Sequence, residues 1–200
     1  MLGWYPDELC KRCVNQAILY FFSIYLKHGE GRTLMCLLFR TQYNDNMLSA
    51  DIATLRRLST QFRKAIDTAK NAREFTCAPL SNFPRACCGE VSDLLAQYLL
   101  ENGIKSIYIA GTYHGEGVDD LQSHAWLEVD GRITIDITGD QFSRNKTFLY
   151  FDKPVWCGSR TDFHKLFEID QVVVENGIDS FPESAARRMW KLYQIICKYL

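Results

Sequence analysis

Three residues of this sequence have types and positions that fit acyl-transfer chemistry: Cys88, His124 and Asp136. A thiol attacks a carbonyl carbon efficiently only as a thiolate, which a helix N-terminus and a neighbouring imidazolium both favour. Cys88 lies where an irregular, proline-containing segment gives way to a helical pattern, and the adjacent Gly89 allows a substrate backbone to approach closely. The alternative interpretation is that Cys87 or Cys88 is merely a small buried residue.

His124 begins a run that alternates polar and apolar residues, and Asp136 lies between two isoleucines in a second such run. Alternation of this kind is typical of strands, in which carboxylates are rare. A buried carboxylate needs a partner, and a histidine is a suitable one. A triad aspartate orients the imidazole of its histidine and stabilises the protonated form. If Asp136 is instead structural and His124 is a surface residue, Asp140 is the next carboxylate to consider.

The apolar pattern also predicts how residues 123–129 and 132–138 pair with each other. A two-residue turn would place apolar residues opposite polar ones along both strands, which is unfavourable. A three-residue loop over 129–131, with Gly131 in the left-handed conformation of a bulged turn, corrects this mismatch. The cross-strand pairs would then be Glu128 with Arg132, Trp126 with Thr134, and His124 with Asp136.

Helical patterns flank the three candidate residues on both sides. Residues 50–73 carry apolar side chains at spacings of three and four, and Ser49 is a plausible N-cap. Residues 88–102 form a second helix, which begins at the candidate nucleophile. Ser180 and Glu183 have the spacing of a capping box for a C-terminal helix.

The order of helix, strand, strand and strand indicates an α+β fold, in which the helix packs on an antiparallel sheet. The strands are expected at 104–110, 123–129, 132–138 and 171–175. Three regions of one compact domain are expected: an N-terminal helical region over 1–75, a core over 76–178 and a C-terminal helix over 179–200.

Residues 83–139 resemble the transglutaminase-like branch of the papain-type cysteine enzyme superfamily. The ordered motifs are Cys88 fifteen residues before Gly103-Ile104, then Gly111-Thr112-Tyr113, His124-Ala125-Trp126 and Asp136-Ile137-Thr138. This resemblance implies a papain/transglutaminase-like core and a triad of Cys88, His124 and Asp136. It favours Cys88 over Cys87, because only Cys88 has the family's distance to the Gly-Ile pair. Gly89 and Ile137 replace a tryptophan and a proline common in transglutaminases, which argues against protein cross-linking.

The resemblance predicts a cysteine hydrolase that cleaves an amide, peptide or isopeptide bond of a protein or peptide through a thioester acyl-enzyme. An acyltransferase or glutamine deamidase would use the same triad, and a partner-binding module with a vestigial triad is the alternative from another class. Asn82, six residues before Cys88, is a candidate oxyanion donor. The glycine-rich loop 111–122 is expected to be mobile and to border the site, with His114 and Trp126 as substrate-loop candidates.

The composition of the chain argues against two classes of binding partner, nucleic acid and the membrane interior. Lys and Arg number 23 against 24 Asp and Glu, and this balance does not favour nucleic acid. The apolar stretch 17–26 has ten residues, too few for a membrane span of about 20 residues, and suits a buried helix. The oligomeric state stays open.

Eight cysteines require an explanation, and several lie within apolar segments. Free cysteine packs as a small hydrophobe, which favours a reduced, cytoplasmic protein, with an exported effector or toxin left open. Cys10 and Cys13 form one C-x-x-C motif without a second pair at zinc-site spacing. We therefore expect no metal and no cofactor.

Overall fold

A computed structural model of the chain describes residues 51–76, 80–115, 121–144 and 150–200. Several expectations therefore lie outside the described residues: the N-terminal helices before residue 51, the apolar stretch 17–26 and the Cys10–Cys13 pair. The predicted Ser49 cap is wrong, because the helix Ile52–Asn71 has Asp51 as its N-cap, whose side chain accepts from the Ala53 N–H at 3.3 Å. No helix in the described ranges is long and apolar enough to cross a membrane.

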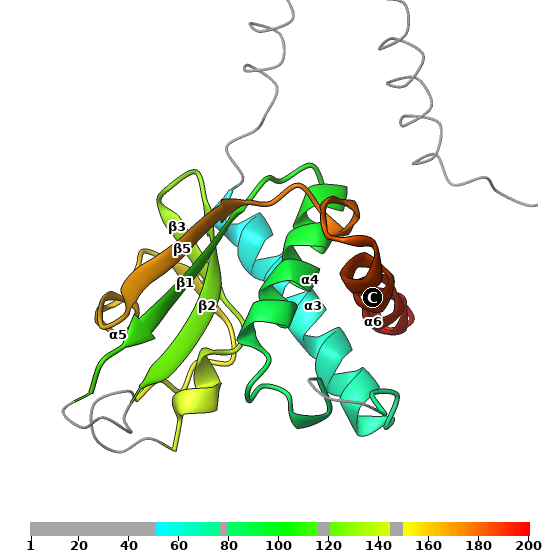
Figure 1. The fold of residues 1–200 in the computed structure, drawn as a ribbon, viewed down its shortest axis with the longest axis horizontal. Coiled ribbons are helices and arrows are strands. Elements are labelled where there is room, and N and C mark those ends of the chain that lie inside the picture. The colour runs from blue at the N-terminus through cyan, green and yellow to red at the C-terminus, as the bar shows by residue number, and fades with distance from the viewer. Residues whose placement is uncertain (1–50, 77–79, 116–120, 145–149) are drawn as a thin grey trace, which may run out of the picture. The chain divides into compact units, whose positions relative to one another are not determined.

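An antiparallel sheet forms the centre of the described region (Figure 1). Its five strands, counted over the described residues, lie in the order β4-β3-β2-β1-β5. The strands are β1 (Ile107–Tyr113), β2 (Gln122–Val129), β3 (Ile133–Asp136), β4 (Trp156–Gly158) and β5 (Glu168–Val174). The predicted α+β class with an antiparallel sheet is confirmed, while β4 was not predicted because three residues are too few to show a period.

Helices cover one face of this sheet (Figure 1). α3 (Ile52–Asn71) and α4 (Cys88–Glu101) contact the strands, and α6 (Glu183–Cys197) packs against these two helices. Leu127 and Ile135 of the sheet share a hydrophobic core with these helices. Because α3 packs on β3, β4, α4 and α6, it belongs to the same unit as the core.

The start of α6 differs from its prediction. Pro182 is the N-cap and makes no side-chain cap bond. Ser180 ends the short 3-10 turn η3 (Ile178–Ser180), and its hydroxyl donates to the Gly177 carbonyl at 2.6 Å. The predicted capping box of Ser180 and Glu183 is therefore wrong, because the Ser180 hydroxyl already closes a turn within the preceding segment.

The other face of the sheet is covered by an aromatic cluster that the strand pattern did not predict. Its buried members are Ile109, Trp126, Phe142, Phe151, Phe163 and Phe167. Two of them lie on the strands β1 and β2. The others come from the 3-10 turn η2 (Gly139–Phe142), from the segment after residue 150, and from the short helix α5 (Asp162–Lys165) and the two residues after it. Both faces of β2 are therefore buried, including the face that carries the polar members of the alternating pattern.

The hairpin between β2 and β3 keeps the predicted faces but shifts the predicted register by two residues. Glu128 pairs with Thr134 instead of Arg132, so the connecting loop is 130–132. Gly131 has a φ of +61°, which confirms its predicted left-handed conformation.

Two features explain the shift. Asp130 is also left-handed, with a φ of +54°, so the turn is centred one residue later than predicted. Glu128 does not need a charged partner across the hairpin, because Arg160 donates to its Oε1 at 3.0 and 2.6 Å. A shift by two residues preserves the direction of every side chain. His124 and Asp136 therefore remain on one face, as diagonal rather than directly opposite neighbours.

Candidate active site

Cys88 is the first residue of α4 and is partly exposed. Its thiol is hydrogen-bonded to His124, to the backbone N–H of Ala125 and to Gln141. Burial alone would raise the pKa of this thiol, but the bond to His124, the charge of His124 and the other two contacts together lower it. Cys88 is thus prepared to exist as a thiolate.

The neighbouring Cys87 has the opposite character. It is the N-cap of α4 and is 1% exposed. Burial, together with the nearby Cys88 and Glu90 charges, raises the pKa of the Cys87 thiol to about 12. The structure therefore distinguishes the two adjacent cysteines by environment.

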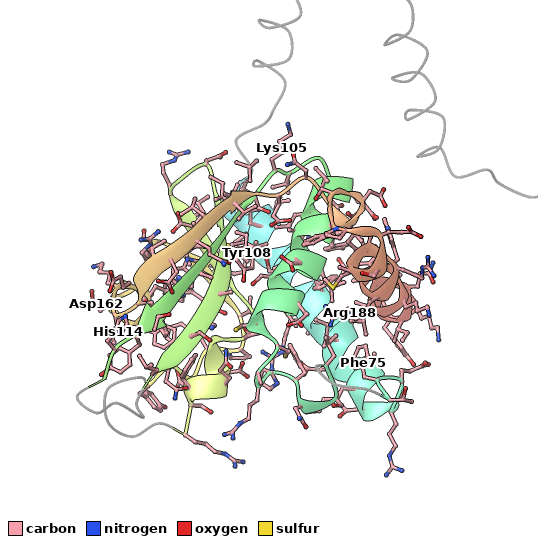
Figure 2. The ribbon with its side chains drawn as sticks, viewed as in Figure 1. Phe75, Lys105, Tyr108, His114, Asp162 and Arg188 are labelled. Atoms are coloured by element: carbon pink, nitrogen blue, oxygen red, sulfur yellow. The ribbon has the colours of Figure 1, made fainter. Side chains whose placement is uncertain are left out.

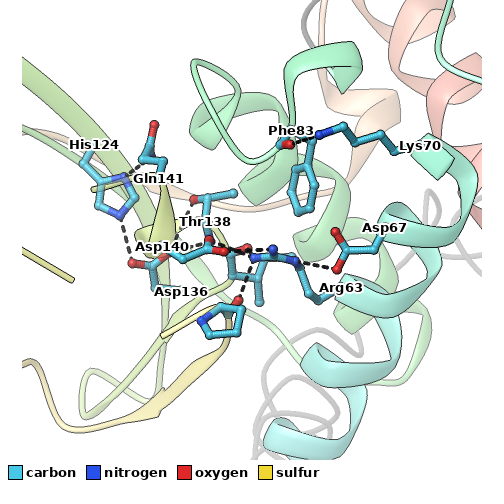
Figure 3. Close-up of polar contacts among 11 residues, drawn as sticks. Arg63, Asp67, Lys70, Phe83, His124, Asp136, Thr138, Asp140 and Gln141 are labelled. Atoms are coloured by element: carbon cyan, nitrogen blue, oxygen red, sulfur yellow. Dashed lines mark hydrogen bonds and ion pairs between the residues drawn. The ribbon is translucent and has the colours of Figure 1, made fainter. Parts of the chain in front are cut away.

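His124, which contacts the Cys88 thiol, is also bound to a carboxylate and to Gln141 (Figure 3). Its Nε2 donates to Asp136 Oδ2 at 2.8 Å, and its Nδ1 lies 3.1 Å from Gln141 Nε2. Burial would lower the pKa of this imidazole, but the charge and hydrogen bond of Asp136, with further help from Cys88, raise it to about 9. Aromatic rings surround the imidazole: Trp126, Phe142, Phe163 and Phe167.

Asp136 ends β3 and is 1% exposed. Its Oδ1 accepts from the backbone N–H of Thr138 at 2.9 Å and from the hydroxyl of Thr138 at 3.3 Å. Its Oδ2 accepts from His124 and also from His164 Nε2, at 3.3 Å. Burial would raise the pKa of this carboxyl, but the charge of His124 and the hydrogen bonds of both histidines hold it well below its usual range.

Gly139 stands directly against this carboxylate. A Cβ at this position would lie 2.5 Å from Asp136 Oδ2 and 2.5 Å from a ring carbon of Phe151. Real Cβ contacts are never that short, so only glycine fits while the carboxylate keeps its place. The tight turn after β3 is therefore matched to the position of Asp136.

An ion pair fixes η2 to α3 (Figure 3). Arg63 donates from both terminal nitrogens to the two carboxylate oxygens of Asp140, each at 2.9 Å. Arg63 Nη1 also donates to the carbonyls of Ile137 and Pro154, at 2.8 and 2.9 Å. Asp140 is thus committed to Arg63, while Gln141 beside it reaches His124.

The remaining sequence candidates lie elsewhere. Asn82 is exposed at the end of η1 (Leu80–Asn82), where its carbonyl accepts from Arg85 N–H, and no hydrogen bond between described residues joins its side chain to Cys88. His114 follows β1, and its exposed side chain pairs with the exposed Glu168 at 3.4 Å (Figure 2). Trp126 is fully buried beneath His124, so it supports the imidazole instead of forming a substrate loop.

The predicted loop 111–122 is shorter than expected. Residues 111–113 belong to β1 and Gln122 to β2, and residues 116–120 lie outside the described residues. The prediction that this loop is mobile therefore stays a prediction.

Gln141 and His164 are the two site residues that sequence reasoning missed. Both come from segments after β3 with no clear strand or helix pattern, and neither belongs to the motifs that carry the family resemblance. The available signal in the sequence for Gln141 was its position in a polar pair, Asp140-Gln141, shortly after Asp136. Of this pair, only Asp140 was named as a candidate.

Among the described residues, no group of three histidine, cysteine or acidic side chains could hold a metal ion. A scan against family models, a search of curated proteins and a search of solved structures each find no significant match to this chain. The function of the site must therefore be inferred from its own geometry.

Proposed function

We propose that this chain is a cysteine hydrolase that cleaves an amide, peptide or isopeptide bond in a protein or peptide substrate. The observation that supports the proposal is the chain of contacts from the partly exposed Cys88 thiol to His124 and from His124 to Asp136 at 2.8 Å. A nucleophile, a base and a residue that orients the base, in hydrogen-bond contact and in this order, form the arrangement that activates a thiol.

In the first step, the Cys88 thiolate attacks the carbonyl carbon of the scissile bond and forms the new C–S bond. The carbonyl electron pair moves onto oxygen. The Cys88 backbone N–H has no intrahelical acceptor, since the first helical bond of α4 runs from Val91 N–H to the Cys87 carbonyl. We assign this N–H as one donor to the developing oxyanion.

Collapse of the tetrahedral species breaks the C–N bond. Because His124 Nε2 is held by Asp136, Nδ1 is the nitrogen that gives its proton to the leaving amine. The product of this half-reaction is a thioester on Cys88 and a neutral imidazole at His124.

In the second step, His124 takes a proton from water, whose oxygen attacks the thioester carbon. The C–S bond breaks, the carboxylic acid leaves, and the thiolate–imidazolium pair is restored. Asp136 stays ionised throughout and supports the imidazolium whenever it forms.

The order of elements supports a papain/transglutaminase-like core as part of the same proposal. The proposed nucleophile begins α4, the base lies on β2, and the carboxylate ends β3. The helix precedes the antiparallel strands in the chain, as the resemblance of residues 83–139 implies.

Acylation with p-nitrophenyl acetate tests the proposal. We expect a burst of p-nitrophenol and an acetyl group on Cys88, found by mass spectrometry of peptides from rapidly acid-quenched protein. Cys88→Ala should abolish both, and Cys87→Ala is the matched control that should retain both. Wild-type protein without a Cys88 thioester would contradict the proposal and favour a partner-binding module.

The acyl acceptor is tested in the same assay. Added methylamine competes with water for the thioester. We expect acetate to remain the main product. If the main product were acetyl-methylamide, the reaction would be acyl transfer to amines and not hydrolysis.

A further inference from the structure

A second histidine contacts the carboxylate of the proposed triad. His164 lies on α5 and is fully buried. Its Nε2 is 3.3 Å from Asp136 Oδ2, the same oxygen that accepts from His124. Its Nδ1 is 2.7 Å from the hydroxyl oxygen of Thr161, the N-cap residue of α5.

These contacts determine where the His164 proton lies. A carboxylate only accepts, so Nε2 must carry the hydrogen that it donates to Asp136. The ring lies against Trp126, Phe151 and Phe163, which among the described residues leave it no other polar side chain on that side. In the tautomer that has its hydrogen on Nε2, Nδ1 accepts the hydroxyl proton of Thr161.

Both carboxylate oxygens of Asp136 thus accept hydrogen bonds, which together restrict rotation of the carboxylate. Thr138 holds Oδ1 through its N–H and its hydroxyl, and the two histidines hold Oδ2. If the His164 donor were absent, a buried carboxylate would lose one of its hydrogen bonds and its rotation would be less restricted. Both changes weaken its support of the His124 imidazolium.

We propose that His164 is a positioning residue, an N–H donor that holds the Asp136 carboxylate in place for His124, with Thr161 fixing its tautomer. The inference rests on the proposed function, because it assigns to His164 a part in activating Cys88. It adds a fourth and a fifth side chain to the hydrogen-bonded series, which runs from Thr161 through His164, Asp136 and His124 to Cys88.

Other charged groups near this series are already paired. Arg63 and Asp140 bind each other on the α3 side of Asp136, and Arg160 and Glu128 bind each other beyond Trp126. On α5 itself, Lys165 pairs with Asp162 at the surface. The groups that face His164 or Asp136 directly and titrate are therefore His124 and, through it, Cys88.

The test measures the rate of Cys88 alkylation by iodoacetamide against pH, which reports the thiolate without any substrate. In His164→Leu, we expect the acid midpoint of this profile to move up by about one pH unit, the size expected from a lost hydrogen bond to a charged group. His164→Gln keeps an N–H donor near the Nε2 position and should restore the wild-type midpoint to within about a third of that shift.

Two further pairs of variants make the result specific. Thr161→Val should shift the midpoint in the same direction by a smaller amount, and Thr161→Ser should not shift it. His114→Gln, at the exposed histidine that pairs with Glu168, is the control for loss of an imidazole. Circular dichroism of each variant verifies folding.

A purely structural role for His164 would lower the melting temperature and leave the midpoint unchanged, and this result in the folded His164→Leu or Thr161→Val variant would overturn the inference. Failure of the proposed function looks different. There, Asp136→Asn would also leave the midpoint unchanged, or the wild-type Cys88 would show no acid-shifted reactivity at all.

Discussion

Cys87 and Cys88 show how strongly the fold can separate two identical side chains. They are adjacent, but one thiol points into the hydrophobic core and the other meets an imidazole, an amide and a backbone N–H. The pKa values of the two thiols consequently move in opposite directions. The opposite pKa shifts follow from the environment of each thiol, since the residue type is the same.

This contrast predicts selective labelling. At about pH 6, iodoacetamide should modify Cys88 much faster than Cys87, because the pKa of the Cys88 thiol is lowered from its ordinary value and the pKa of the Cys87 thiol is raised to about 12. Peptide mapping with time measures both rates. Equal rates at the two positions would show that the thiol–imidazole contact does not form in solution.

The pH profile of turnover should have two limbs. Activity should rise with pH as Cys88 ionises, at a pKa lower than that of a free thiol, and it should fall again near pH 9 as His124 loses its proton. Initial rates in a constant-ionic-strength buffer series measure both limbs. A single limb rising through the ordinary thiol pKa near 8.5 would contradict this expectation.

Asp136→Asn removes the charge that supports the His124 imidazolium. We expect turnover to fall by roughly a thousandfold or more, because an amide neither compensates the imidazolium nor selects the required tautomer. The backbone N–H of Thr138 can still donate to the amide oxygen, so the fold should be retained. Steady-state rates with a thermal melt measure both effects, and activity within tenfold of wild type would exclude this role for Asp136.

The helices and strands of the core place residues from separate segments of the chain next to one another. The N-terminus of α4, the first half of β2 and the end of β3 meet at the site, and η2 then returns Gln141 to the imidazole. The two turns on this path have different needs. Gly131 adopts a left-handed backbone conformation, whereas Gly139 is required because a Cβ at this position would clash with Asp136 and Phe151.

Substitutions at these glycines should therefore differ in effect. Gly131→Val should destabilise the fold by about 1–3 kcal/mol, because a β-branched residue at positive φ is strained, while Gly131→Asn tolerates that conformation better. Gly139→Ala should instead displace Asp136 or Phe151 and slow Cys88 alkylation at about pH 6. Melts and labelling rates for the three variants separate the two effects. Normal labelling in Gly139→Ala would show that the turn relaxes without moving the carboxylate.

In the unit as a whole, the sheet is enclosed between helices on one face and aromatic rings on the other. Arg63 links these layers, since it leaves α3 and binds Asp140 and two carbonyls beside the site. Arg63 is 8% exposed, and its guanidinium carbon lies 4.5 Å from the centroid of the Phe83 ring. The helix layer thus holds the turn that carries Gln141.

Arg63→Met should accordingly have a large effect. Breaking a buried ion pair from one side costs about 3–5 kcal/mol, because the remaining charge loses its compensation. Chemical denaturation measures this loss, and the double variant Arg63→Met with Asp140→Asn should recover part of it. If the single variant is as stable as wild type, the ion pair does not hold α3 to η2.

Sequence alone indicated a large part of this unit. The positions of Cys88, His124 and Asp136, the helix that begins at Cys88, the antiparallel hairpin and the positive φ of Gly131 all follow from local patterns. Such patterns are readable because backbone geometry repeats every two or 3.6 residues, so a stretch of chain carries its own signal. The shared face of His124 and Asp136 was readable for the same reason, since a register error of two residues does not change side-chain direction.

The tertiary structure decided the rest. The shift in register depended on Arg160, the role of Asp140 on Arg63, and the burial of Trp126 on phenylalanines from distant segments. Gln141 and His164 reach the site from short elements without a detectable period. Contacts between residues far apart in the chain leave no local pattern, because each depends on where two separate segments are placed by the packing of the whole core.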